Sequence, residues 1–225
     1  MDYKYLIFIP ARGGSKELKN KNIRKIGSKT LLEITINQAN NLKLKNSYIY
    51  VSTDSYKYKK LIEKKKCNIP FLRSKNNSGD NSNIIDAILE FAKNSKDNFE
   101  NIIMLQPTSP LRKINSFKNK IELLDKNKFN SIISIKNINR SKEFIFKLNK
   151  NNKILLKKSI KQNPNRQKNK TLFTPCGCFY ATKLSLLKKS KNFYNLPVYG
   201  VETHFPYNID IDNKIQYNIV KKLKN

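Results

Sequence analysis

Residues 7–22 read IFIPARGGSKELKNKN, and the rest of the chain is arranged around this stretch. The apolar run at residues 6–9 predicts a buried strand that stops at Pro10. A loop that contains Gly13 and Gly14 follows at once. We expect the two glycines to let the backbone approach a ligand closely and to accept positive φ angles. Successive backbone N–H groups in such a loop form an anion-binding hollow, so the stretch indicates a phosphate-binding loop.

Basic side chains strengthen this interpretation. Arg12, Lys16 and Lys21 offer charge-assisted hydrogen bonds to phosphate oxygens. Neither GxGxxG nor GxxxxGK[ST] fits, because Ser15 separates Gly14 from Lys16. The loop is therefore neither a dinucleotide fingerprint nor a P-loop. From this stretch alone, an ordinary basic loop between a strand and a helix remains the alternative.

The length of 225 residues fits one α/β domain with an ample core. No apolar run reaches the roughly 18 residues that a transmembrane helix requires. The apolar part of the N-terminal segment is too short for a secretory signal. We therefore expect a cytoplasmic protein without a membrane partner.

The formal net charge of +30 raises the hypothesis of nucleic-acid binding. However, the lysines are spread along the whole chain and alternate with asparagines, as in residues 19–22 and 149–153. Both residue types have A/T-rich codons, so a biased genome explains the composition. We favour that explanation and expect no nucleic-acid partner, although the charge still concentrates anionic substrates near the protein.

The three cysteines form no disulfide framework. Cys176 and Cys178 are a poor zinc pair, because His204 is the single histidine of the chain. We expect small buried thiols instead.

Strand and helix patterns alternate through the first third of the chain. Residues 30–44 predict a helix that Ser28 caps, and residues 48–52 predict a strand that ends in Thr53-Asp54. A second helical stretch runs to residue 66, and residues 69–72 form a short strand or extended segment. This alternation predicts a parallel sheet of βαβ units, in which ligands lie at the carboxyl ends of the strands.

Two polar loops follow at that predicted edge. Arg73 comes directly after the extended segment, and Ser82 precedes a predicted helix at residues 84–93. A helix N-cap at residues 81–83 is an alternative role that is compatible with ligand binding. A strand at residues 101–106 ends in a loop that two prolines hold in a defined shape.

Gln106 stands at the carboxyl end of that strand, with an amide that both donates and accepts hydrogen bonds. The alternative for the loop is a rigid turn with a helix cap at Asn115. A helix at residues 116–128 and a strand at 131–135 follow. The short runs 144–148 and 154–156 predict a small hairpin outside the parallel sheet.

Near the end of the chain, residues 207–213 read YNIDIDN. In an extended strand, alternation puts Asp210 and Asp212 on one side and the isoleucines on the other. Two adjacent carboxylates favour a cation, and hard oxygen ligands suit Mg²⁺ that also binds substrate phosphates. The alternative is that Asp212 caps the last helix, which runs to residue 223.

Four segments resemble the CMP-sialic acid synthetase family of cytidylyltransferases, which activates N-acylneuraminic and other nonulosonic acids. Residues 7–22 contain PAR, SK and KN in the family's order, and residues 105–112 read LQPTSPLR, like a second family signature. Residues 166–180 stand where the family has an Arg-Gln pair and an NGxxY segment. Residues 207–213 resemble its DIDT signature.

The resemblance implies a Rossmann-like, three-layer α/β nucleotidyltransferase fold with a mostly parallel sheet. It implies a single cytidylyltransferase domain over residues 1–225, with a small inserted dimerisation segment around residues 137–170. The implied reaction joins CTP and a nonulosonic acid, with Mg²⁺ as cofactor, to give the CMP-sugar and pyrophosphate. The resemblance also implies a homodimer that serves the biosynthesis of cell-surface polysaccharide.

The resemblance also implies a role for each matching residue. The residues with catalytic roles are Arg12, Lys16, Lys21 and Asp212. The residues that bind the nucleotide are Ala11, Arg12, Gly13, Asn22, Arg73 and Ser82. The residues that face the sugar acid are Gln106, Arg166 and Tyr180, and the metal ligands are Asp210 and Asp212.

Some of these implications stay open. For Arg166 we expect a bidentate contact with the acid's carboxylate, and a solvated loop arginine is the alternative. Cys176 replaces the family's usual asparagine, and Asn213 replaces its threonine. The identity of the sugar acid is therefore not predicted. A CMP-Kdo synthetase remains an alternative, although its loop normally reads SxRLPxK where residues 15–21 read SKELKNK.

Overall fold

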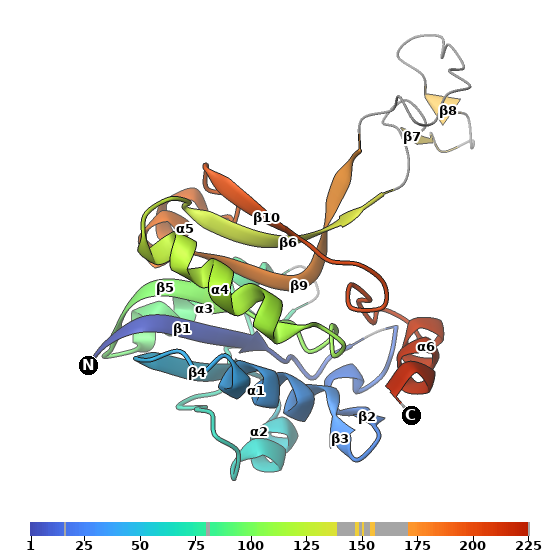
Figure 1. Ribbon diagram of the computed structural model, residues 1–225. Helices are drawn as coiled ribbons and strands as arrows, with labels where there is room; N and C mark the ends of the chain where they lie inside the picture. The colour runs from blue at the N-terminus through green and yellow to red at the C-terminus, as the bar shows by residue number, and fades with distance from the viewer. Residues whose placement is uncertain are drawn as a thin grey trace.

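The computed structural model describes residues 1–15, 17–79, 82–138, 147–148, 150, 154–155 and 171–224 (Figure 1). The six strands of the main sheet are β1 (Asp2–Pro10), β4 (Ser47–Ser52), β5 (Asn98–Met104), β6 (Ser131–Asn137), β9 (Phe173–Lys183) and β10 (Val198–Glu202). The helices are η1 (Lys21–Ile23), α1 (Leu31–Asn41), α2 (Tyr56–Ile62), α3 (Ile84–Asn94), α4 (Ile114–Asp125), α5 (Leu184–Ser190) and α6 (Lys214–Lys224). Two small hairpins are formed by β2 (Lys25–Ile26) with β3 (Lys29–Thr30), and by β7 (Lys147–Leu148) with β8 (Ile154–Leu155).

The main sheet has the strand order β10-β6-β9-β5-β1-β4. Strands β1, β4 and β5 pair in parallel, as do β6 and β10, whereas β9 runs antiparallel to both of its neighbours. The mostly parallel sheet is therefore confirmed. The carboxyl ends of β1, β4 and β5 lie side by side, because Pro10 pairs with Ser52 and Phe8 pairs with Met104.

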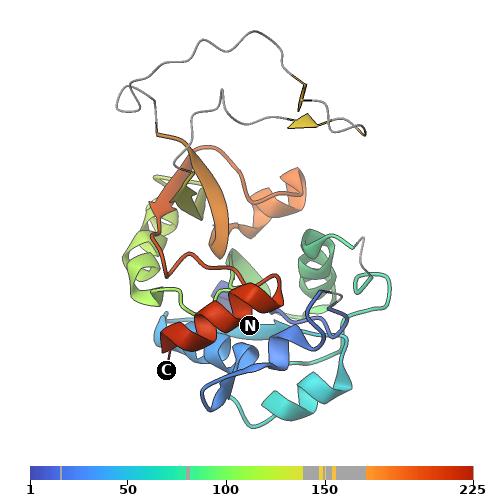
Figure 2. The same cartoon turned by 90° about the vertical axis from the view of Figure 1, so that its right-hand side faces the viewer.

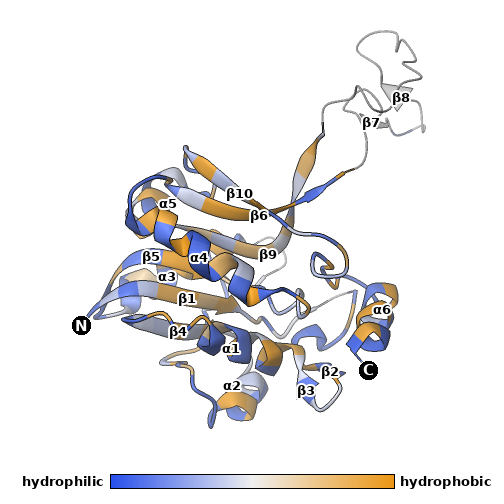
Figure 3. Cartoon of the chain, in the orientation of Figure 1, coloured by the Kyte–Doolittle hydropathy of each residue, from blue (hydrophilic) through white to orange (hydrophobic). Residues whose placement is uncertain are grey.

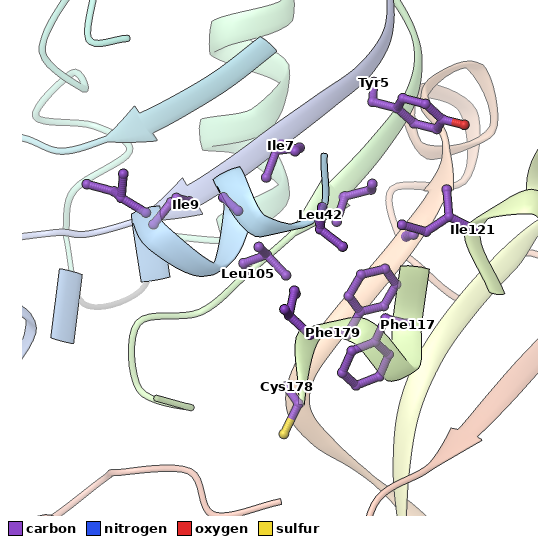
Figure 4. Close-up of a cluster of buried hydrophobic side chains, with 14 of the residues drawn as sticks. Tyr5, Ile7, Ile9, Leu42, Leu105, Phe117, Ile121, Cys178 and Phe179 are labelled. Atoms are coloured by element: carbon purple, nitrogen blue, oxygen red, sulfur yellow. The ribbon is translucent and has the colours of Figure 1, made fainter. Parts of the chain in front are cut away.

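Helices cover both faces of this sheet, which confirms the three-layer α/β fold (Figure 2). Apolar side chains of α1, α2 and α4 pack on one face, and those of α3 and α5 pack on the other. The first face includes the stacked rings of Phe117 and Phe179, whose centroids are 4.6 Å apart (Figure 4). Residues 6–9 of β1 are fully buried, since both faces of a parallel strand are covered. The hydropathy colouring accordingly shows much of β1, β5 and β9 as apolar (Figure 3).

Local hydrogen bonds correct two predictions about helix ends and confirm a third. Thr30, not Ser28, caps α1 through a capping box with Glu33, because the Lys29–Thr30 strand places Thr30 directly before the first turn. Asn83 caps α3, as one of the alternatives held. Asn115 does not cap α4, since the helix begins at residue 114 and includes it.

Two predicted element bounds also change. The helix α2 ends at Ile62 rather than at residue 66, where a run of charged residues offers no apolar side chain to bury. Residues 69–72 form no strand, and the neighbouring Asn68 makes an isolated parallel bridge to Tyr50. The β7–β8 pair confirms a small hairpin outside the main sheet. Most of the predicted insertion at 137–170 lies outside the described residues. No helix in the described part of the chain is both long and apolar enough to cross a membrane.

Candidate active site

A cavity of about 530 Å³ lies at the carboxyl ends of β1, β4 and β5, where the parallel sheet predicts a ligand site. Its lining combines the phosphate loop, the segment before α3, the loop after β5 and one residue near α6. The lining residues are Pro10, Arg12, Ser15, Glu17, Lys21, Asn22, Arg73, Ser82, Ile84, Gln106, Pro107, Thr108 and Asp212. Seven residues of the predicted site thus meet in one hollow, although they are drawn from the whole length of the chain.

The phosphate loop is held by a carboxylate from the neighbouring strand. The Gly13 N–H donates to Asp54 Oδ1 at 2.7 Å. A Cβ on Gly13 would lie 3.2 Å from the Ser55 Cβ, so the glycine permits a close approach. Neither Gly13 nor Gly14 has a positive φ, which contradicts that part of the prediction. Asn20 (φ 57°) adopts the left-handed conformation in this loop instead.

Arg12 joins the phosphate loop to the segment before α3. Its Nη1 donates to the Gly79 carbonyl at 3.0 Å, and the Ser82 hydroxyl donates to the same oxygen at 2.5 Å. The buried Asn22 amide donates to the Arg12 carbonyl at 3.0 Å. Ala11 is buried behind these groups, with its N–H on the Ser52 carbonyl at 2.8 Å. The predicted nucleotide-binding residues therefore form one connected wall.

Arg73 lines the same wall and is buried, with 6% of its surface exposed. Its Nε donates to Ser52 Oγ and its Nη2 to the Ser52 carbonyl, both at 2.9 Å. Burial lowers the pKa of Arg73 from its ordinary value, and the neighbouring Tyr50 opposes this effect. The guanidinium is thus fixed by the end of β4 before any ligand arrives.

The acidic pair lies in an extended segment that is not part of a sheet, so the predicted strand is wrong. The predicted alternation nevertheless holds, because Ile211 is fully buried and Ile209 packs against the same cluster. The half-buried Asp210 accepts from Ser109 Oγ at 3.4 Å. Burial raises its pKa, and the negative charge of Asp212 raises it further.

Asp212 is exposed at the cavity wall, with Lys21 Nζ 3.8 Å from its Oδ1. It does not cap the last helix. Asn213 Oδ1 accepts from the Gln216 N–H at 3.0 Å, and Gln216 Oε1 accepts from the Asn213 N–H at 3.1 Å. This reciprocal pair is a capping box. The carboxylate of Asp212 is therefore available to the cavity.

Gly177 (φ 76°) brings two predicted ligand groups together. A Cβ at this position would lie 2.7 Å from Asp210 Oδ2 and 2.8 Å from Gln106 Oε1. Tyr180, three residues further along β9, does not line the cavity, and its ring lies 5.6 Å from that of Phe193. Burial raises the pKa of Tyr180, and the charge of Asp210 adds to the rise, which places the phenol within electrostatic range of that carboxylate.

Cys176 and Cys178 are buried thiols, as predicted. Cys176 Sγ lies 3.0 Å from Thr203 Oγ1 and 3.7 Å from the sulfur of Cys178. The hydrogen bond between the thiols, together with burial, raises the pKa of Cys178. Cys176, which replaces the family's asparagine, therefore packs in the core instead of lining the cavity. Lys16 and Arg166 lie outside the described residues.

The sequence matches the family model described as cytidylyltransferase over residues 6–225. The chain belongs to the cytidylyltransferase family. The chain is 28% identical to the CMP-N,N'-diacetyllegionaminic acid synthase of Legionella pneumophila over 98% of its own length and 96% of that protein. It is 24% identical to the N-acylneuraminate cytidylyltransferase of Streptococcus agalactiae over 94% of its own length, but spans only 51% of that relative.

Among solved structures, this cytidylyltransferase is similar to CMP:2-keto-3-deoxy-manno-octonic acid synthetase in complex with CTP. The TM-score is 0.69 with 17% identity, and the match covers 98% of both chains. At that identity the likeness shows the fold, and it confirms the predicted nucleotidyltransferase architecture. The family match likewise confirms that the protein is a nucleotidyltransferase.

Three contributors to the cytidylyltransferase site have no predicted role in the sequence. Asp54 holds Gly13, and its position after a strand was the available signal. Gly177 lets the side-chain oxygens of Gln106 and Asp210 lie close to the backbone of β9. Arg112 is buried and donates to the main-chain carbonyl of Gln106. Burial lowers the pKa of Arg112 to about 10, which still leaves it a cation at neutral pH. Its place in the LQPTSPLR segment was the signal.

The acidic groups suit a metal that is shared with the substrate. No cluster of three or more His, Cys, Asp or Glu side chains exists among the described residues, so they build no all-protein metal cage. Asp210 and Asp212 instead offer two carboxylates near Thr108, one of them at the cavity wall. Mg²⁺ characteristically binds through one or two carboxylates plus substrate phosphates. The donor set therefore fits Mg²⁺.

Proposed function

We propose that this protein is a CMP-nonulosonic acid synthetase, which transfers the cytidylyl group of CTP to a nine-carbon sialic-acid-like sugar acid. The single observation that carries the proposal is the cavity at the carboxyl edge of the sheet, which gathers Arg12, Lys21, Arg73, Gln106 and Asp212. The names of the two relatives described above support the choice of sugar acid.

In the proposed reaction the anomeric hydroxyl oxygen of the acid attacks the α-phosphorus of CTP. The bond from this phosphorus to the oxygen that bridges to the β-phosphorus breaks, pyrophosphate leaves and one proton is released. Positioning and charge neutralisation supply most of the catalysis in phosphate chemistry of this kind. Arg12 and Lys21 line the cavity from the phosphate loop and stabilise the charge that leaves with pyrophosphate.

The wall of Asn22, Arg73 and Ser82 places the cytidine, and Gln106 faces the sugar acid. Asp210 and Asp212 hold Mg²⁺ in this proposal. When bound, Mg²⁺ supplies charge neutralisation at the triphosphate. Lys21, which lies 3.8 Å from Asp212, offsets the charge of this carboxylate before the substrate arrives. Roles for Lys16 and Arg166, a homodimer and a cytoplasmic location remain predictions from the sequence.

Pyrophosphate release from CTP and Mg²⁺ tests the proposal. The panel contains N-acetylneuraminic, legionaminic and pseudaminic acids together with Kdo, at moderate salt. We expect release with a nine-carbon acid and none without an acid. Release with Kdo alone identifies a CMP-Kdo synthetase and refutes the proposed substrate class. Absence of release with every acid, together with salt-sensitive binding to DNA or RNA, would favour a nucleic-acid-binding protein.

A further inference from the structure

Arg112 is a buried cation that the proposed reaction does not use. It ends the loop after β5, and only 4% of its surface is exposed. Arginine is almost never this buried unless it is paired. Its Nη2 donates to the main-chain carbonyl of Gln106, six residues earlier at the carboxyl end of the same strand. The guanidinium therefore supports the backbone from which the Gln106 side chain projects.

Two further donors of this guanidinium are unused. Nε and Nη1 of Arg112 have no hydrogen-bond partner in the described residues, and the described acids make no ion pair with Arg112 within 4.0 Å. The charges that act on it include the Asp210 carboxylate. An unpaired buried charge destabilises a fold, and apolar replacements of buried charges are often neutral or stabilising. Stability alone therefore does not account for an arginine at this position.

Hydrogen bonds join the loop after β5 to the acidic segment above Arg112. The Ile211 N–H donates to the Thr108 carbonyl at 2.8 Å, and Ser109 Oγ donates to Asp210 Oδ1 at 3.4 Å. On the far side of the loop, Gln38 Nε2 donates to the Pro110 carbonyl at 2.9 Å. The loop after β5, which carries Arg112, is thus bonded directly to the acidic segment.

Gly177 closes this arrangement from β9. Its Cα faces Asp210 Oδ2 and Gln106 Oε1 so closely that no side chain fits. Gln106 is therefore held at two points, with its side-chain Oε1 against the backbone of β9 and its main-chain carbonyl on the Arg112 guanidinium. Loss of the Arg112 donor would release the second of these points.

We propose that Arg112 is a positioning residue that holds Gln106 in the geometry that the sugar acid requires, without touching the substrate itself. This inference rests on the proposed function, in which Gln106 faces the acid. It assigns Arg112 to the acid side of the site, because the nucleotide wall of Arg12, Arg73 and Ser82 is held by Ser52 and Gly79 instead.

Steady-state kinetics of Arg112→Met separate positioning from a structural role. We expect KM for the acid to rise, or kcat to fall, by about 10- to 100-fold, as for other supporting groups behind a site. KM for CTP should stay within about twofold of wild type, since the nucleotide wall has its own supports. The melting temperature should be unchanged or higher. Equal changes in both KM values, with a lower melting temperature, would overturn the proposal.

Two further variants complete the test. Arg112→Lys keeps the charge but loses the fork, so it should recover part of the loss. Lys128→Met removes one positive charge from an exposed residue beyond the C-terminal end of α4 and should behave as wild type. Arg112→Lys and Arg112→Met that both match wild type with the acid would overturn the inference.

A crystal structure of Arg112→Met gives a readout that does not need turnover. We expect the Gln106 side chain to move away from its position against Gly177. An unchanged position overturns the inference whichever substrate the enzyme uses. If wild type releases no pyrophosphate with any acid, the proposed function fails by that assay, and the crystal structure still decides whether Arg112 positions Gln106.

Discussion

Replacing Gly177 by alanine should lower activity by more than backbone strain alone explains. The added Cβ would lie 2.7 Å from Asp210 Oδ2 and 2.8 Å from Gln106 Oε1. An ordinary contact begins near 3.4 Å, so the Asp210 oxygen has to retreat by about 0.7 Å. A misplacement approaching 1 Å costs about 100-fold in rate, or about 2.7 kcal/mol of transition-state free energy. The residue also has φ 76°, which costs an alanine about 1–2 kcal/mol of folding free energy.

The chain contains a matched control for the backbone part of this effect. Gly27 has φ 60°, and a Cβ there would meet nothing within 4 Å. Gly27→Ala should therefore lose a similar 1–2 kcal/mol of folding free energy but keep the kcat/KM of wild type. The difference in activity between the two variants isolates the displacement of Asp210 and Gln106.

The assay is pyrophosphate release with CTP, Mg²⁺ and the acid that wild type uses, combined with denaturant unfolding of each variant. Wild-type kcat/KM in Gly177→Ala would refute the reasoning, because the oxygens would then have moved without consequence. An equal loss of activity in Gly27→Ala would refute it as well, because backbone strain would then explain the whole effect.

Three other substitutions test separate parts of the structure. Asp212→Ala should abolish turnover but leave the melting temperature near wild type, since the side chain is exposed and caps no helix; activity restored by saturating Mg²⁺ would argue against its metal role. In metal-free buffer, Asp210→Asn should raise the free energy of unfolding at neutral pH. The reason is that burial holds the folded-state pKa of Asp210 above its ordinary 3.8, so ionisation of this carboxyl opposes folding. The gain in unfolding free energy should vanish below pH 3.8, where the carboxyl is protonated in both states. A variant less stable than wild type at pH 7 would contradict this prediction. Thr30→Ala should cost about 1 kcal/mol of stability by removing the cap of α1, with unchanged kcat/KM, as denaturant titration and the same assay would show.

The sequence predicted the elements whose signal is local. The apolar run before Pro10 became the buried part of β1, because an unbroken apolar stretch needs cover on both faces. Arg12 and Gln106 follow parallel strands and Ser82 precedes a helix, and the carboxyl ends of parallel strands meet at one edge. Order along the chain was therefore enough to place them in the same cavity.

Helix caps and glycine conformations were predicted less well, because neighbouring structure selects among equivalent candidates. Ser28 and Thr30 are both capping residues by type, and the short β3 strand selected Thr30. Gly13 and Gly14 were expected at positive φ, yet Gly177 adopts that conformation at the site. The resemblance to the NGxxY segment marked this glycine, but the groups that crowd it come from residues 106 and 210, so the local sequence did not predict its conformation.

The sequence by itself determined the family, the strand–loop motif for phosphate and the pair of carboxylates, since each depends on residue types within a few positions. Only the tertiary structure decided how these parts support one another. Gly13 meets Asp54 across 41 residues, and Ser109 meets Asp210 across 101. Contacts at such separations depend on strand order and packing, which residue type and local periodicity do not encode.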